Sequence, residues 1–422
     1  MKASWLAVFL LAGVSVQAGA APVRQVAASK AYKAAVAQLD REHDRIVAEI
    51  VKLTEIPAPP FKEKARGTAY ADMMRAAGLA DVEMDAEGNV TGLWRGTGPA
   101  GGPLIVIAAH QDTVFPEGTP VKVRREGTKL FAPGIGDDTR SLAVLLGYIR
   151  AMKAAGVRTA KDILFVGNVG EEGPGDLRGT RYLFGKSKYK GRIAAFFSMD
   201  GTDGSRIVNT GVGSKRYRVT FKGPGGHSYG AFGLVNPMAA MSQAVVDLYK
   251  VEVPKSPKTT YSASVTGGGT SVNSIPNDVF MEFDMRSVSA EELGKLDQRF
   301  QAIVRSAVEG ENRARSTREG AVNADLKVIG ERPAGGTPAT SEIVRVAQQA
   351  IEAQGLKPEL NASSTDANVP MNLGIPAITI GSGGSGGRAH SLDEWIDVEK
   401  GASLKGMLPG LTMLLAMADL QN

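Results

Sequence analysis

The 422-residue sequence contains no cysteine. This absence excludes disulfide bonds, thiolate metal sites and cysteine nucleophiles. Aromatic residues make up only 6% of the chain, and no stripe of basic residues alternates with them, so we expect no nucleic-acid partner. A transition metal bound by this chain has only imidazole and carboxylate ligands available, which is a donor set that suits zinc.

Beyond the N-terminus, the sequence lacks long hydrophobic runs. No segment there is apolar over the length of a transmembrane helix. Residues 1–20 combine Lys2, an apolar run over residues 5–16 and an Ala18-Gly-Ala20 sequence. This order predicts a signal peptide cleaved after Ala20, with an uncleaved membrane anchor as the alternative. We therefore expect a periplasmic or secreted protein with no stable membrane insertion after signal cleavage.

Apolar strands and helices alternate along most of the chain. Helices are predicted over residues 34–53, 65–77, 141–154, 340–353 and 398–417, and strands over residues 81–84, 90–94, 104–109, 163–169, 193–199 and 377–380. Because strands that alternate with helices pair in parallel, this pattern predicts an α/β domain with a mainly parallel sheet. We assign residues 34–213 and 332–422 to this domain.

Residues 214–331 follow a different pattern. Strands are predicted over residues 215–221, 261–265, 279–285 and 324–329, and helices over residues 236–249 and 291–309. This β-α-β-β-α-β order is that of a ferredoxin-like α+β domain. We expect it to be inserted into the α/β domain.

His110 ends the apolar run over residues 104–109 and is followed by Gln111 and Asp112. Side chains in a strand repeat every second residue, so we expect Asp112 to lie on the same face as His110. A carboxylate there can accept the second ring N–H of the imidazole, as the partners of metal-bound histidines do. Of the other three histidines, His43 lies on a charged helix and is expected at the surface.

Four further segments place acidic or imidazole side chains at strand ends or just before a helix. They contain Asp137, the Glu171-Glu172 pair, Asp200 and His390. In open α/β sheets, ligands bind at the C-terminal edge of the strands. The expected metal ligands are His110, Asp137, Glu172, Asp200 and His390. Two zinc ions about 3.5 Å apart, held by such donors, form a common hydrolytic site.

Adjacent side chains at a strand end point in different directions, so Glu171 and Glu172 can have different roles. One can bind a metal while the other acts as a general base toward water. The pair could instead be a solvated loop pair, just as Asp138 could cap the following helix and Asp200 could be a turn residue. Their joint occurrence in one ordered set favours the metal interpretation.

This ordered set closely resembles the cocatalytic dizinc metallopeptidase family that includes peptidase T, carboxypeptidase G and the aminoacylases. The matching motifs are His110-Gln-Asp112, Gly136-Asp137-Asp138, Glu171-Glu172-Gly173, Asp200 and His390. The similarity covers nearly the whole mature chain. It implies a three-layer zinc-exopeptidase-like catalytic domain with an inserted dimerisation, or lid, domain. One departure is Thr139, where the family often has lysine; that lysine is not a metal ligand.

The resemblance also implies a role for each residue. Asp137 would bridge two metals ahead of a cis peptide bond, His110 and Asp200 would complete one metal, and Glu172 and His390 the other. Asp112 would orient His110, and Glu171 would be the general base and acid. Family members with aspartate at the position of Asp200 tend to be aminopeptidases or dipeptidases, whereas glutamate goes with carboxypeptidases and deacylases.

The inserted domain carries further matches. Residues 223–228, Gly-Pro-Gly-Gly-His-Ser, look like the family's Gly-Gly-His-Ser loop. There the histidine, His227 in this chain, reaches the active site of the partner subunit in a homodimer and polarises the substrate carbonyl. Asn273 and Arg286 match positions that hold the terminal carboxylate of the substrate. Taken alone, His227 fits a structural turn residue and Arg286 a surface charge on a strand.

These observations predict a zinc-dependent exopeptidase of the aminopeptidase or dipeptidase type, with two Zn²⁺ per subunit or Co²⁺ or Mn²⁺ in their place. Its substrate would be a small peptide or an N-acyl amino acid. The alternatives are an N-acyl-amino-acid deacylase or a glutamate carboxypeptidase on the same scaffold. A non-catalytic periplasmic binding protein built on the fold is a third alternative.

Overall fold

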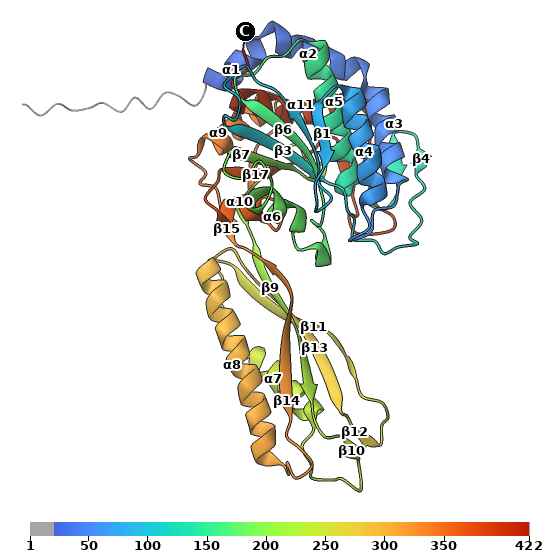
Figure 1. The fold of residues 1–422 in the computed structure, drawn as a ribbon, viewed down its shortest axis with the longest axis vertical. Coiled ribbons are helices and arrows are strands. Elements are labelled where there is room, and N and C mark those ends of the chain that lie inside the picture. Colours follow the sequence, from blue (N-terminus) through green and yellow to red (C-terminus); the bar gives the residue numbers. More distant parts are fainter. Residues whose placement is uncertain (1–20, 422) are drawn as a thin grey trace, which may run out of the picture.

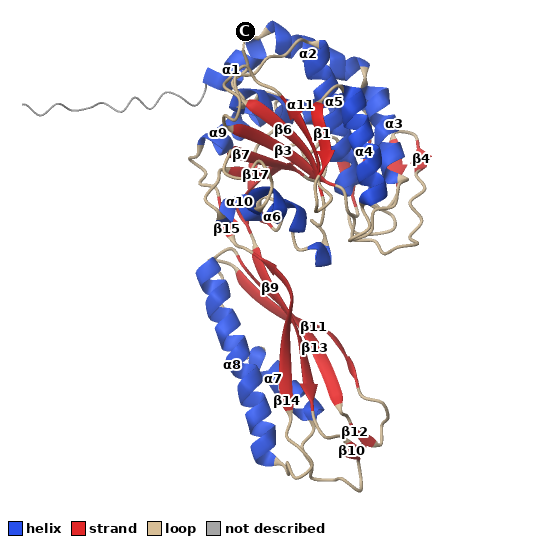
Figure 2. Cartoon of the chain, in the orientation of Figure 1, coloured by secondary structure: helices blue, strands red, loops and turns tan. Residues whose placement is uncertain are grey.

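A nine-stranded sheet lies at the centre of the larger of two units (Figures 1 and 2) in the computed structural model, which describes residues 21–421. The predicted signal peptide lies outside the described residues. The strand order is β1-β2-β6-β3-β7-β17-β8-β15, with β16 beside β8. The strands are β1 (Ala80–Met84), β2 (Val90–Trp94), β3 (Leu104–His110), β6 (Asp162–Asn168), β7 (Ile193–Met199), β8 (Arg206–Gly211), β15 (Gly335–Gly336), β16 (Glu359–Ser363) and β17 (Ala377–Ile380).

The four central strands, β6, β3, β7 and β17, pair in parallel. Pairing is antiparallel toward the two ends of the order, where β1 pairs with β2, β2 with β6, and β15 with β8. The β17–β8 pair is also antiparallel. The predicted mainly parallel sheet is therefore confirmed for the centre of a mixed sheet. Central strands of this kind are buried on both faces, which is why they are continuously apolar in the sequence.

Side chains of β3 alternate between two hydrophobic cores, one on each face of the sheet. Ile105, Ile107 and Ala109 lie in the first core, and Leu104 and Val106 lie in the second. The first face is covered by α1 (Ala21–Ala28), α2 (Lys30–Arg41), α3 (His43–Thr54), α4 (Lys64–Ala77), α5 (Arg140–Ala154), α9 (Glu342–Glu352) and α11 (Lys400–Met417), and the second by α6 (Arg178–Gly185) and α10 (Asn368–Asn372). This unit therefore has three layers. Within residues 21–421, no helix has the length and apolar character to cross a membrane.

Three expectations about local structure differ from the observed fold. The single helix expected over residues 34–53 is two helices, which meet at Glu42. The strands β8 and β16 were not predicted. His43 was expected at the surface, but it is only 5% exposed. Since α3 begins at His43, the imidazole shares the buried stripe of Ile46 and Ile50, three and seven residues further on.

The smaller unit has the predicted β-α-β-β-α-β order. Its elements are β9 (Gly213–Lys222), α7 (Pro237–Leu248), β11 (Thr259–Gly268), β13 (Asp278–Ser287), α8 (Ala290–Ala314) and β14 (Asn323–Arg332). The strands form an antiparallel sheet in the order β11-β13-β9-β14, and a separate hydrophobic core packs against both helices. A short two-stranded antiparallel sheet of β10 (Gly226–His227) and β12 (Ser274–Ile275), which are distant along the chain, lies at the end of this unit farthest from the large sheet (Figure 1).

A second small sheet joins distant parts of the larger unit. It contains β18 (Ser385–Gly387), β19 (Trp395–Asp397), β5 (Lys129–Phe131) and β4 (Arg124–Glu126), in that order. The loop between β18 and β19 contains His390, and the turn that contains Asp137 follows β5. The pairing of β19 with β5 therefore brings these two candidate ligands close together.

We predict that Phe300→Ala lowers the free energy of unfolding by about 3–5 kcal/mol, the usual cost of removing a buried aromatic ring. Phe300 is 1% exposed, and its ring centroid lies 4.7 Å from that of Phe283 and 5.4 Å from that of Tyr217. Chemical denaturation measures the change. Val265→Ala is the control because Val265, in the same unit, is 46% exposed. Equal losses for the two variants would contradict the assignment of this core.

Candidate metal centre

Three neighbouring parallel strands deliver acidic and imidazole side chains to one edge of the sheet. His110 is the last residue of β3, Asp200 directly follows β7, and the Glu171-Glu172 pair follows β6. Since β6, β3 and β7 are adjacent and parallel, their C-terminal ends meet at the same edge. These side chains therefore lie at the C-terminal edge of the sheet, as their positions at strand ends predicted.

Asp137 lies between the two histidines. One of its carboxylate oxygens, Oδ1, is 2.9 Å from Nε2 of His110, and the other, Oδ2, is 3.1 Å from Nε2 of His390. The same His390 nitrogen lies 2.9 Å from Oε1 of Glu172. The peptide bond between Asp137 and Asp138 is cis, as the resemblance implied. Asp137 thus presents a different oxygen to each half of the site.

All five predicted ligands come together in two groups that share Asp137. Ligand atoms of His110, Asp137 and Asp200 lie within 4.8 Å of one another, and so do those of Asp137, Glu172 and His390. These groups have the composition that the resemblance implied for the two metals. Nitrogen and oxygen donors of this kind fit two divalent cations, which would neutralise carboxylates that are costly to bury together.

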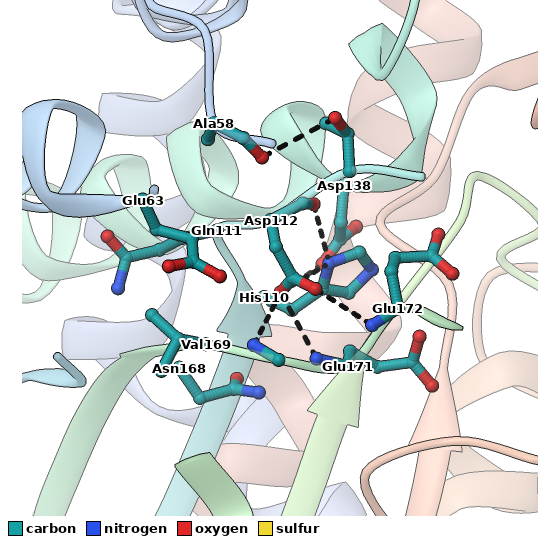
Figure 3. Close-up of polar contacts among 12 residues, drawn as sticks. Ala58, Glu63, His110, Gln111, Asp112, Asp138, Asn168, Val169, Glu171 and Glu172 are labelled. Atoms are coloured by element: carbon teal, nitrogen blue, oxygen red, sulfur yellow. Dashed lines mark hydrogen bonds and ion pairs between the residues drawn. The ribbon is translucent and has the colours of Figure 1, made fainter. Parts of the chain in front are cut away.

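Asp112 acts differently from the sequence-based expectation. The Nδ1–H of His110 donates to the backbone carbonyl oxygen of Asp112 at 3.0 Å, whereas the Asp112 carboxylate is 3.7 Å away. That carboxylate accepts backbone N–H groups from Gly170 at 2.9 Å, Glu171 at 3.1 Å and Glu172 at 2.8 Å (Figure 3). The strand ends at His110, so its two-residue alternation does not extend to residue 112. Asp112 therefore holds the loop of the glutamate pair as well as the His110 tautomer.

Glu394 holds the Asp137 turn in the same manner, and sequence reasoning missed it. Its carboxylate accepts the backbone N–H groups of Gly134 at 2.9 Å, Gly136 at 2.7 Å and Asp137 at 2.9 Å. Burial and the negative charge of Asp137 raise the pKa of Glu394 to about 7. Its only sequence signal is its position four residues after His390.

Glu171 lies beside the metal ligands and contacts Arg332, a second residue that sequence reasoning missed. Arg332 is the last residue of β14 and is 5% exposed. Its Nη1 lies 3.1 Å from Oε1 of Glu171 and 3.2 Å from Oγ of Ser364, and its Nη2 donates to the carbonyl oxygen of Glu171. A charge-assisted contact of this kind fixes the Glu171 side chain. No sequence motif points to Arg332, which is distant from Glu171 along the chain.

The pKa values in the cluster follow from crowding and burial. Burial raises the pKa of Glu171 well above its ordinary value. Burial and the charge of Asp137 raise the pKa of Asp200 to about 6. Hydrogen bonds to Asp137 and Glu172 raise the pKa of His390 to about 10. The carboxylates thus attract positive charge, and divalent cations can supply it.

Two simpler interpretations, a solvated Glu171-Glu172 pair and a helix cap at Asp138, disagree with the structure. Glu171 and Glu172 are only 6% and 5% exposed, so a solvated loop pair is wrong. Asp138 does not cap α5, whose start has no side-chain cap; it is fully buried, and its Oδ2 accepts the backbone N–H of His110 at 3.2 Å. The Glu171-Glu172 pair and Asp138 are therefore parts of the site.

The three predicted residues of the inserted unit lie at its two ends. His227 and Asn273 lie together at the distal end, beside β10 and β12, where the N–H of Ser228 donates to the Asn273 carbonyl. Arg286 lies near the other end of β13. The strand rise puts it about 26 Å from Asp278, where β13 begins. Its Nε is 2.7 Å from Oδ2 of Asp284. Asn273 and Arg286 therefore do not meet at one carboxylate-sized site within the chain.

Comparison with known proteins agrees with this geometry. Residues 106–418 match the profile of Peptidase family M20/M25/M40. The chain is similar to carboxypeptidase G2 from Pseudomonas sp. (strain RS-16), with 26% identity over 321 residues that cover 74% of this chain and 72% of the relative. It is also similar to succinyl-diaminopimelate desuccinylase from Polaromonas sp. (strain JS666 / ATCC BAA-500), with 25% identity over 331 residues and 74% of each chain covered.

Solved structures share the fold. Aminopeptidase PepT from Bacillus cereus ATCC 10987 superimposes with a TM-score of 0.71 at 21% identity, over 89% of this chain and 99% of its own. The dipeptidase Dug1p from Saccharomyces cerevisiae superimposes with a TM-score of 0.68 at 15% identity, over 92% of this chain and 98% of its own. A dinuclear metal-binding peptidase from Bacillus subtilis also matches, with a TM-score of 0.64.

We predict that Asp112→Asn weakens metal binding by about 10- to 100-fold, the usual effect of removing a group that orients metal ligands. The amide presents an NH₂ group to backbone N–H donors of residues 170–172, so the loop that contains Glu172 loses its anchor. Competition with a chromophoric chelator measures the affinity. Asp72→Asn is the control because Asp72 is exposed and pairs only with Arg75. Unchanged affinity in Asp112→Asn would show that the loop does not depend on this carboxylate.

Proposed function

The chain belongs to peptidase family M20/M25/M40 and is a metallohydrolase of that family; we propose that it is a zinc-dependent exopeptidase that hydrolyses short peptides, of the aminopeptidase or dipeptidase type. The observation that carries this proposal is the position of Asp137, whose two oxygens face His110 and His390. A carboxylate that serves two adjacent donor groups is the arrangement that a two-metal hydrolytic site needs.

We assign the metal ligands as the family resemblance implies. His110 and Asp200 would hold one ion, Glu172 and His390 the other, and Asp137 both. Zinc suits these donors, and Co²⁺ or Mn²⁺ could take its place. When bound, the two ions polarise the carbonyl oxygen of the substrate and lower the pKa of a water molecule.

Glu171 would transfer the proton. It lies next to the ligand Glu172 and is buried. Its carboxylate lies within 4.8 Å of ligand atoms of His110 and Glu172, but it belongs to neither group that shares Asp137. In this role its carboxylate removes a proton from the attacking water. It then donates that proton to the leaving nitrogen as the C–N bond breaks. Arg332 keeps the carboxylate in place for both steps through its contact at 3.1 Å.

A second candidate function is deacylation of N-acyl amino acids or release of a C-terminal glutamate. The names of two sequence relatives, carboxypeptidase G2 and succinyl-diaminopimelate desuccinylase, favour it, whereas Asp200 and the names of the structural relatives favour a peptidase. Rates on dipeptides and tripeptides with free N-termini, compared with rates on N-acyl amino acids, separate the two. Family membership argues against a non-catalytic binding protein.

The location and assembly of the protein are further parts of the proposal. The composition of residues 1–20 supports export to the periplasm or the medium. A homodimer is supported by the position of His227 and Asn273 beside β10 and β12, at the end of the inserted unit farthest from the large sheet (Figure 1), because a second chain can bring them to an active site.

We predict that Glu171→Gln lowers kcat by at least about 100-fold, because the amide cannot accept the proton of water. Elemental analysis should still find two zinc ions per chain, since the metal ligands are unchanged. Glu352→Gln, an exposed position on α9, is the matched control. Turnover near that of the unmodified enzyme would refute the assignment of Glu171.

We also predict that His227→Ala lowers kcat while each chain retains its metals, and that sedimentation shows a dimer. Mixing His227→Ala with Glu171→Gln tests the role of the partner subunit. In a mixed dimer, one active site can combine an intact Glu171 with an intact His227 from the other chain. Recovered activity above that of either variant is the expected result. A purely monomeric protein, or no recovery, would exclude the contribution from a second chain.

A further inference from the structure

A cavity of about 290 Å³ lies directly beside the candidate metal centre. Asp137 and Asp200 form the wall on the side of the ligands, and Arg206, Arg388 and Trp395 belong to the rest of the lining. Several glycines complete the wall with bare backbone, which leaves room for a bound group. This volume fits a small side chain or acyl group rather than a long peptide.

Arg206 is the unusual group in this cavity. It is the first residue of β8 and is half-buried. Its guanidinium makes no ion pair or hydrogen bond with any side chain in residues 21–421. The other cation of the lining, Arg388, differs because its Nη2 lies 3.0 Å from Oδ2 of Asp393. Arg206 therefore offers free donors to whatever enters the cavity.

Three of the four acidic side chains of the lining are already engaged by other groups. Both oxygens of Asp137 contact histidines, and the Glu394 carboxylate accepts three backbone N–H groups. Asp203 turns toward its own loop, where its Oδ1 accepts the N–H of Ser205 at 2.9 Å and the hydroxyl at 2.7 Å. None of these three carboxylates forms an ion pair with Arg206. The fourth, Asp200, lies close enough to attract the Arg206 charge, but within residues 21–421 no hydrogen bond or ion pair joins the two side chains.

The position of Glu171 decides which part of the substrate occupies this cavity, a step that rests on the proposed function. Glu171 donates a proton to the leaving nitrogen, so the leaving amine must lie on its side of the site. Glu171 does not belong to the cavity lining; it lies with Arg332 at the end of β14. The acyl part of the substrate, on the other side of the scissile bond, therefore extends toward the cavity.

We propose that this cavity binds the acyl part of the substrate and that Arg206 selects a carboxylate there. The preferred acyl group is an aspartyl or glutamyl residue at the N-terminal side of the scissile bond, or a dicarboxylic acyl group of similar length. A guanidinium binds a carboxylate through two parallel hydrogen bonds, which gives it both energy and direction. Trp395 contributes an apolar surface for the methylene groups between the two carbonyl carbons.

Matched substrate pairs test the proposal and separate the two sources of the carboxylate. Asp-Ala is compared with Asn-Ala, and N-succinyl-alanine with N-butyryl-alanine. In the unmodified enzyme, kcat/KM for the acidic member of at least one pair should exceed that of its neutral partner by about tenfold or more, as expected for a hydrogen bond to a charged group. The pair that shows this preference identifies the natural class of acyl group.

Arg206→Gln should reduce the acidic preference to within about twofold, while Arg206→Lys should retain part of it. The matched control is Arg345→Gln on α9, an exposed arginine whose guanidinium donates to the Thr340 carbonyl; it should keep the full preference. An equal loss for acidic and neutral substrates in Arg206→Gln would overturn the proposal, because it would show a general structural role.

Direct binding gives a readout that does not depend on turnover. Calorimetry on Glu171→Gln should show that succinate binds about tenfold more tightly than butyrate, and that adding Arg206→Gln removes the difference. Equal binding of the two acids, with equal rates within both substrate pairs, would overturn the acyl-site proposal and leave the hydrolase assignment intact. Selective succinate binding without hydrolysis of any amide would support the site and refute the proposed function instead.

Discussion

Mutual repulsion of crowded carboxylates is the constraint on which the site depends. Asp137, Glu171, Glu172 and Asp200 converge at one edge of the sheet, where the two glutamates are buried and the two aspartates are half-buried. Such a cluster is unfavourable unless positive charge lies among its members. Two histidines and Arg332 supply part of that charge, and two divalent cations would supply the rest. The chemistry of the site and the stability of its loops therefore depend on the same electrostatic balance.

Two buried carboxylates keep this crowded arrangement in one geometry. Asp112 accepts three backbone N–H groups from the loop of the glutamate pair, and Glu394 accepts three from the Asp137 turn. Neither needs to touch a substrate. Each converts a loop that would otherwise be mobile into a fixed support, which is what precise placement of ligands requires. The site thus consists of donor side chains at strand ends and of two carboxylates, Asp112 and Glu394, that hold the neighbouring loops.

The inserted unit shows how one chain can hold residues that it does not bring together. Its long antiparallel strands separate the junction, where Arg286 and Arg332 lie, from the distal sheet of β10 and β12, with His227 and Asn273. Arg332 connects this unit to Glu171 within the chain. The sheet of β10 and β12 has no such connection to the ligands within the described residues. One part of the predicted site therefore forms within the chain, whereas His227 and Asn273 lie apart from it.

The sequence by itself determined the class of fold and the five candidate ligands. Apolar strands buried on both faces have a distinct pattern, and residues at the ends of adjacent parallel strands must meet at one edge. Only the tertiary structure decided the parts that depend on long-range contacts. Arg332 and Arg206 carry no local signal, and Glu394 has only its closeness to His390, because each acquires its role from partners that are distant along the chain. The backbone N–H partners of the Asp112 carboxylate were not predicted for a related reason: the chain turns after His110, and strand periodicity predicts side-chain direction only while the strand continues.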